Sequence, residues 1–88
     1  MPDFGVVVHR GRRSGRLYQT PVNVFATEDG YVLVLTYGPD TDWVKNVLAA
    51  GGCELRTRGR AIRLTSPRLF SAMTGATAKG SGLHVSSR

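Results

Sequence analysis

Short apolar runs separated by turn residues occupy most of the chain, and their periodicity predicts strands. Residues 4–9 (FGVVVH) are apolar and β-branched on consecutive positions, which is typical of a strand buried on both faces. Residues 18–27 predict a second strand, because Val22, Val24 and Ala26 would lie on one face and Asn23, Phe25 and Thr27 on the other. A third strand is expected over 31–36, after a hairpin turn at residues 28–30 in which Gly30 can supply a positive φ. The first part of the chain therefore predicts a small antiparallel sheet.

A helix is predicted after the third strand. Asp40 or Thr41 can cap its N-terminus, it continues to Ala50, and Gly51 with Gly52 ends it in the left-handed conformation. Four apolar residues recur at i,i+4 and form one face of this helix: Trp43, Val44, Val47 and Leu48.

A second hairpin follows the helix. Its strands are expected over residues 53–58 and 61–65, joined by a turn at Gly59 and Arg60. Residues 69–73 favour a short helix, whereas residues 74–88 are rich in Gly, Ser, Thr and Ala without periodicity and predict a disordered tail. The expected fold is mainly β with one or two helices, in a single domain over residues 1–73.

The charge of the chain indicates an anionic partner, and its cysteine content indicates a reducing compartment. The 88 residues include 12 Lys and Arg against 6 Asp and Glu, a net charge of +6. The single cysteine, Cys53, excludes an internal disulfide. The apolar runs are too short for a transmembrane segment, and the chain begins without a signal-peptide pattern. A soluble cytoplasmic protein is expected.

The clearest candidate for chemistry is the loop over residues 11–16, Gly-Arg-Arg-Ser-Gly-Arg. Glycine permits turned backbone and close approach of a ligand, and arginine presents a planar fork that matches phosphate or carboxylate oxygens. We interpret the loop as an anion cradle. The alternative is a solvated connection between two strands, which is the commoner role of such a sequence.

Three further residues have two interpretations each. Pro21 indicates either an edge strand or a place where a ligand faces the backbone, since proline cannot donate to a ladder. Trp43 is either a core anchor or a ligand contact, and Asn46 is either a solvated helix residue or a ligand contact. Metal ligands are not expected, because the two histidines and the cysteine do not have ligand spacing: His9, Cys53 and His84.

Several elements together carry a family resemblance: the residues from His9 to Arg16 (HRGRRSGR), Pro21 five residues later, Tyr-Gly-Pro-Asp at 37–40, and Asp42-Trp43 followed by Asn46. Over residues 5–67 the chain resembles the deazaflavin (F420)-dependent nitroreductase and quinone reductase family of actinobacteria. The resemblance implies a split β-barrel of the FMN-binding-like kind. The flanking helical and strand segments usual in that family have no counterpart here, so an incomplete barrel is expected, and its open edge suggests a homodimer.

The resemblance also implies an oxidoreductase activity, in which the reduced coenzyme passes a hydride to a small electrophilic acceptor such as a quinone or nitro compound. The phosphate and acidic tail of the coenzyme would lie on the arginine loop, its ring beside the second strand, and the remaining contacts would come from the residues before and within the helix. In chain order the implied cofactor-binding residues are Arg12, Arg13, Ser14, Arg16, Pro21, Val22, Asn23, Gly38, Trp43 and Asn46, and Tyr37 is the candidate for a catalytic residue at the reacting ring.

Three alternatives stay open. Charge alone does not separate F420 from FMN, because both coenzymes carry a phosphate. A small basic β-barrel with aromatic residues on its strands could instead bind single-stranded nucleic acid by base stacking. The chain could also be a non-catalytic remnant of the family.

Overall fold

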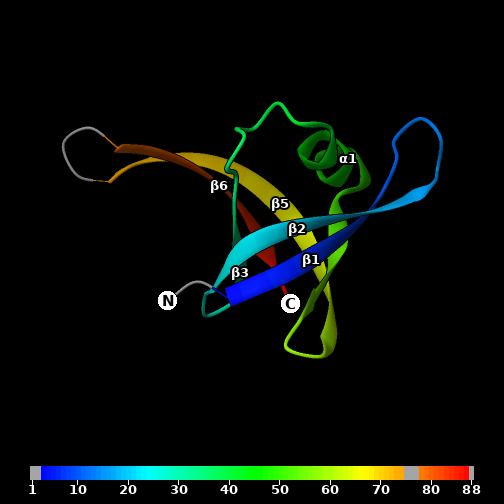
Figure 1. Cartoon of the computed structure of the whole chain (residues 1–88), viewed down its shortest axis with the longest axis horizontal. Helices are drawn as coiled ribbons and strands as arrows, with labels where there is room; N and C mark the ends of the chain where they lie inside the picture. The colour runs from blue at the N-terminus through cyan, green and yellow to red at the C-terminus, as the bar shows by residue number, and fades with distance from the viewer. Residues whose placement is uncertain (1–2, 75–77, 88) are drawn as a thin grey trace.

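The computed structural model describes residues 3–74 and 78–87, and the side chains of residues 3–70 and 81–87. The described residues form one α-helix and an antiparallel barrel that closes in the order β1-β2-β3-β6-β5-β4 (Figure 1). The elements in chain order are β1 (Asp3–Arg10), β2 (Leu17–Ala26), β3 (Gly30–Val34), α1 (Asp42–Ala50), β4 (Gly52–Thr57), β5 (Arg60–Thr74) and β6 (Ala78–Ser86).

The interior of the barrel holds the apolar core. Among the side chains that the structure describes, this core comprises eleven buried aliphatic ones: Val7, Val22, Val24, Leu33, Leu35, Val44, Val47, Leu55, Leu64, Leu83 and Val85. In β1 the inward positions are Gly5, Val7 and His9, while Val6 and Val8 are only partly buried. The expectation of a strand buried on both faces was therefore wrong, because the wall of a small barrel has one face inside and one outside.

The hairpin between β2 and β3 is confirmed, but Gly30 is needed for a different reason than expected. Gly30 is not among the glycines with positive φ. It pairs with Ser86 of β6, and a Cβ atom at this position would collide with the backbone carbonyl of Val85. The absence of a side chain lets the backbones of β3 and β6 approach closely.

The predicted helix is confirmed with both of its ends. Thr41 is the N-cap residue in extended conformation, although its hydroxyl makes no capping hydrogen bond. Gly51 has φ 75° and ends the helix. Of the apolar residues expected on one face, Val44 and Val47 are fully buried, whereas Leu48 is exposed. In Figure 1, α1 lies across one end of the barrel, where it contacts β1, β4 and β5.

The second hairpin turns one residue earlier than predicted. Thr57 pairs with Arg60, so Arg58 and Gly59 form the two-residue loop, with φ values of 52° and 73°. A two-residue hairpin loop of this kind places both central residues at positive φ, which matches the right-handed twist of the strands.

The largest correction concerns the C-terminal part of the chain. Residues 69–73 belong to the long strand β5 instead of a short helix, and residues 78–86 form β6 instead of a disordered tail. The prediction of a disordered tail rested on the many small residues of this segment and overlooked Leu83 and Val85, which are fully buried. Because β6 pairs with both β3 and β5, the described strands form a closed barrel instead of the expected incomplete one. An open edge of the kind from which a homodimer was expected remains at residues 17–23 of β2, which pair with β1 alone.

The far ends of β5 and β6 project from the barrel on the side opposite the β1–β2 loop (Figure 1). The part of the tail expectation that falls on residues 75–77 and 88 lies outside the described residues. No helix within the described residues is long and apolar enough to cross a membrane.

Candidate functional site

A pocket of about 640 Å³ opens where the β1–β2 loop meets the first turns of α1. Its walls come from the end of β1, the loop, the start of β2 and the helix. The lining residues are His9, Gly11, Arg12, Arg13, Ser14, Tyr18, Gln19, Thr20, Asp42, Trp43 and Asn46. This volume lies within the usual range for small-molecule and cofactor sites.

The arginine loop has a defined conformation. Gly11 donates its N–H to the carbonyl of Arg16 at 2.7 Å, and Gly15, at φ 73°, donates to the carbonyl of Gly11 at 2.9 Å. The Arg10 guanidinium donates to the carbonyl of Gly15 at 2.6 Å, and the hydroxyl of Ser14 accepts the N–H of Arg16 at 3.2 Å. These contacts fix the loop before any ligand binds.

Gly11 occupies the floor of this cradle. A Cβ atom there would lie 2.7 Å from the Ser14 hydroxyl and 2.9 Å from the Tyr18 ring, so a larger residue would displace both side chains. This close approach, and not a positive φ, explains the glycine at position 11.

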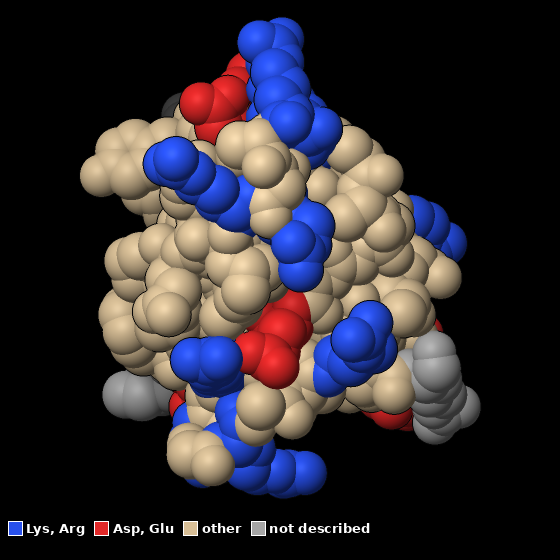
Figure 2. Space-filling view, turned by 90° about the vertical axis from the view of Figure 1, so that its right-hand side faces the viewer, with Lys and Arg blue, Asp and Glu red and all other residues tan. Residues whose placement is uncertain are grey.

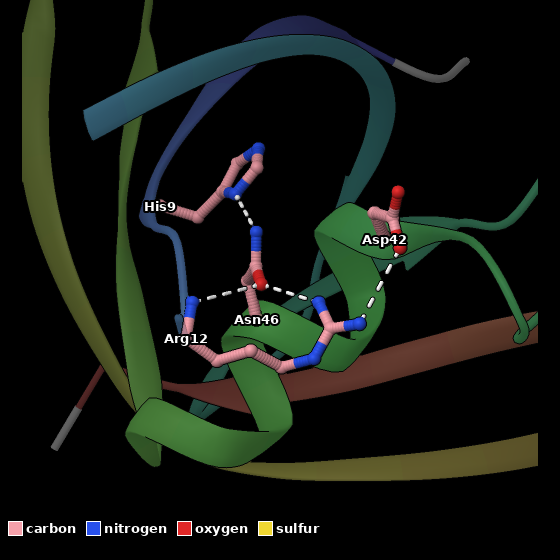
Figure 3. A network of polar contacts seen from close by, with 4 residues as sticks. All are labelled: His9, Arg12, Asp42 and Asn46. Atoms are coloured by element: carbon pink, nitrogen blue, oxygen red, sulfur yellow. Dashed lines mark hydrogen bonds and ion pairs between the residues drawn. The ribbon is translucent and has the colours of Figure 1, made fainter. Parts of the chain in front are cut away.

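A buried polar network connects the loop to the helix (Figure 3). Asn46 accepts hydrogen bonds at its Oδ1 from the backbone N–H of Arg12 at 3.2 Å and from the Arg12 guanidinium at 2.7 Å. Its Nδ2 lies 3.1 Å from Nδ1 of His9, and Nε2 of His9 lies 2.9 Å from the hydroxyl of Thr20. Arg12 also approaches Asp42 at 3.4 Å, a partly exposed ion pair of small energetic weight.

His9 is the most buried titratable group at the site, at 5% exposed. Burial lowers its pKa, because the charged imidazolium loses hydration. Its ring stacks on Tyr18 at a centroid distance of 5.8 Å and lies 6.5 Å from the ring of Trp43. His9 is therefore neutral at pH 7 and lies next to two aromatic rings.

The positive charge of the site is only partly neutralised. The face that carries the β1–β2 loop presents Lys and Arg side chains over its whole height, with a small acidic group among them (Figure 2). Arg13 and Arg16 are exposed, and neither side chain has an ion-pair or hydrogen-bond partner among the described residues. The pocket therefore has unpaired guanidinium groups at its mouth, which favours an anion.

The structure brings five of the eleven sequence-predicted site residues together. Five of them line the pocket: Arg12, Arg13, Ser14, Trp43 and Asn46. Asn46 is 5% exposed and is a contact of the loop, so it is not a solvated helix residue. Trp43 packs against the core, as the core interpretation predicts, and it also lines the pocket, where its contact with a ligand stays a prediction.

The other predicted residues lie outside this pocket. Val22 is a core residue at 7% exposed, and Tyr37 is 88% exposed. Pro21 and Asn23 point to the outside of β2, and Gly38 has φ 86° in the loop before the helix. Arg16 is adjacent to the lining residues in the loop but does not line the pocket.

The edge interpretation of Pro21 is confirmed. Residues 17–23 of β2 pair with β1 alone, because the pairing of β2 with β3 is confined to residues 24–26. Pro21 therefore lies on a stretch of β2 with one unpaired edge, where its missing N–H costs no ladder hydrogen bond.

Sequence reasoning missed His9, Tyr18 and Thr20 as site residues. His9 and Tyr18 are opposite each other in the β1–β2 register, and Thr20 is opposite Val7. The available signal was the alternation of β2: Tyr18 and Thr20 continue the inward register of Val22 and Val24 beyond the apolar core. Polar residues at the end of an inward-facing stripe indicate a pocket at that end of the barrel.

The fold and the site together define a small antiparallel β-barrel with a pocket lined by arginine and aromatic side chains. The model of the F420H(2)-dependent quinone reductase family matches residues 3–77 of the chain, so the chain belongs to that family. Its members are oxidoreductases that depend on the reduced deazaflavin coenzyme F420. No curated protein matches the chain.

The residues at the pocket suit this coenzyme. Its phosphate needs donors, and the loop presents the Arg13 guanidinium and the Ser14 hydroxyl beside a glycine cradle. Its planar ring suits an aromatic wall, and Trp43 and Tyr18 both line the pocket next to His9.

Proposed function

We propose that this pocket binds coenzyme F420, and that the chain uses the reduced form to transfer a hydride to a small electrophilic acceptor, a quinone or a nitro compound. The observation that carries the proposal is the position of the arginine loop, which lies against α1 and next to the unpaired edge of β2 in one pocket. A ligand with an anionic part and a flat ring finds both of its requirements there.

In this proposal the anionic part of the coenzyme lies at the mouth of the pocket. Arg13 is the principal partner because its guanidinium is free, and the Ser14 hydroxyl adds a further hydrogen bond. Arg16 extends the positive charge outward, toward the acidic tail. Arg12 is already bonded to Asn46, so we assign it to holding the loop against the helix while it contributes charge.

The residues that would hold the ring of the coenzyme come from the start of β2 and from the helix. Trp43 would form one wall, and Tyr18 and Thr20, which lie on the stretch of β2 that pairs with β1 alone, would face the ring from the strand. Pro21, Val22 and Asn23 continue this stretch outside the pocket and stay predictions as coenzyme contacts. Gly38 and Tyr37 precede the helix, outside the pocket, and Tyr37 stays a prediction without an assigned step.

When bound, the reduced coenzyme supplies the hydride, and the protein supplies binding, orientation and exclusion of water. The aromatic rings of Tyr18 and Trp43 shield the interior of the pocket. His9 is neutral there and hydrogen-bonded through both ring nitrogens, so it holds neighbouring groups and adds no charge to the site.

The test is an anaerobic assay of the purified chain with reduced F420 and one acceptor at a time. We expect the fluorescence of oxidised F420 to appear when a quinone is the acceptor. The same assay with a nitro compound shows whether the chain also reduces nitro groups. Parallel binding titrations with FMN and a short oligonucleotide at moderate salt address the two alternatives. Turnover absent with every acceptor, together with binding of FMN or the oligonucleotide alone, would overturn the proposal.

A further inference from the structure

The hydrogen bonds that link Arg12, Asn46 and His9 have one possible donor-to-acceptor order, which is set by Arg12. The Arg12 guanidinium and backbone N–H can only donate, and both approach the same atom of Asn46. That atom must be the carbonyl oxygen of the amide. The orientation of the buried Asn46 side chain is thereby determined by chemistry.

The direction continues to His9. With its oxygen toward Arg12, Asn46 presents its NH₂ group to Nδ1 of His9 at 3.1 Å. An amide NH₂ can only donate, so Nδ1 is the unprotonated nitrogen of a neutral imidazole. The ring proton is then on Nε2, which donates to the hydroxyl oxygen of Thr20 at 2.9 Å.

The network ends at Thr20. Its hydroxyl oxygen accepts from His9, and its own proton has no acceptor among the described residues. Thr20 lines the pocket and is only partly buried. A donor that faces a pocket without a partner is suited to a ligand acceptor.

We propose that His9, as its Nε2–H tautomer, is a positioning residue that makes the Thr20 hydroxyl a hydrogen-bond donor to a carbonyl oxygen of the ring bound in the pocket. This inference rests on the proposed function for the identity of the ligand. A carbonyl oxygen on a flat ring occurs both on the deazaflavin and on a quinone, and the experiment below separates these two sources.

The surroundings of His9 maintain the neutral form that the relay needs. Burial lowers its pKa, and Tyr18, Trp43, Asn46 and Thr20 surround the ring without placing a carboxylate against it. The charged groups nearby are Arg12, which contacts Asn46, and the exposed Asp42, which contacts Arg12. A proton added at Nδ1 would face the Asn46 NH₂ group, donor against donor, and would break this hydrogen bond.

The first test reads the tautomer without any ligand. In a long-range ¹H–¹⁵N NMR spectrum at pH 7.5, we expect His9 to show a protonated Nε2 and an unprotonated Nδ1. The Nδ1–H tautomer would overturn the inference. This result is independent of whether the chain binds F420, so it separates a failure of the relay from a failure of the proposed function.

The second test removes or retains the hydroxyl. Thr20→Val should raise the dissociation constant of oxidised F420, or the KM of a water-soluble benzoquinone, by about fivefold, the weight of one neutral hydrogen bond. Thr20→Ser should remain close to the parent chain. A loss in F420 binding assigns the carbonyl to the coenzyme, and a loss in the quinone KM alone assigns it to the acceptor.

Thr57→Val is the matched control. The hydroxyl of Thr57 is also buried and hydrogen-bonded, to the carbonyl of Phe4, but it lies outside this pocket. This variant should lose stability without changing either constant. Equal constants for Thr20→Val and the parent chain, or equal losses for the Val and Ser variants, would overturn the role of Thr20.

Discussion

The side-chain amide of Asn46 lies 3.1 Å from Nδ1 of His9, although 37 positions separate the two residues in the chain. Each of these residues is 5% exposed, and the contact joins α1 to the end of β1 at the base of the pocket. Asn46 also accepts two hydrogen bonds from Arg12, so a single buried amide fixes the position of the arginine loop relative to His9.

The amide is expected to control the protonation of His9. In Asn46→Asp a carboxylate can still accept from Arg12 but has no proton to donate to His9, so it favours the imidazolium. We expect the pKa of His9 to rise above its value in the parent chain. The measurement is the pH titration of the His9 ring protons by NMR.

Asn23→Asp is the control for this change. It makes the same substitution on the exposed outer face of β2, where the carboxylate is solvated. The pKa of His9 should be nearly unchanged in this variant. An unaltered His9 titration in Asn46→Asp would contradict the network described above.

The stability of the chain should depend on pH through His9. Because burial lowers the pKa of His9 in the folded chain, the unfolded chain binds the proton more readily. The free energy of unfolding should therefore be fully retained above about pH 6.5, the ordinary histidine value, and should fall as the pH drops below it. Urea unfolding at pH 7.5 and at pH 5.5 measures this difference.

His9→Gln removes the titrating ring and should flatten the pH dependence in this window. Asp29 titrates below this window, because the ordinary pKa of an aspartate is 3.8 and the hydrogen bond with His84 is the main cause that lowers the pKa of Asp29 further. The same slope in the parent chain and in His9→Gln would show that another group is responsible.

The C-terminal strand should contribute to the stability of the barrel. Leu83 of β6 is fully buried, so Leu83→Ala leaves a cavity and is expected to lower the free energy of unfolding by about 2–5 kcal/mol. Leu17→Ala makes the same change at a position that is 62% exposed and should cost far less. Equal small losses in urea unfolding for both variants would mean that β6 is not part of the cooperative core.

Much of the fold could be predicted from local patterns. The hairpin before Tyr31 and the helix that ends at Gly51 follow from turn residues and i,i+4 spacing, and both are confirmed. The last strand could not be predicted in this way. Its pairing with β3 joins residues that lie 48 to 56 positions apart in the chain, and its glycines and serines imitate the composition of a disordered tail.

The part of the site that comes from neighbouring residues in the chain could be predicted, whereas the part that forms only when distant residues meet in the fold could not. The arginine loop stands out because its glycines and arginines are adjacent, and a family motif pointed to Asn46. His9 begins the family motif, but nothing local indicated its role or that of Thr20, since each is a single polar residue in an otherwise ordinary strand. Their roles depend on the antiparallel register of β1 and β2 and on the position of α1 above them.

The most direct test of the central claim is a fluorescence titration of oxidised F420 into the parent chain, Arg13→Ala and Arg60→Ala. Arg60 is an exposed arginine at the start of β5, away from the pocket, so the two variants have the same net charge. We expect saturable binding by the parent chain, weaker by about tenfold or more in Arg13→Ala, the weight of one charged hydrogen bond, and nearly unchanged in Arg60→Ala. Equal affinities for all three proteins, or no binding by the parent chain, would contradict the assignment of this pocket to the coenzyme.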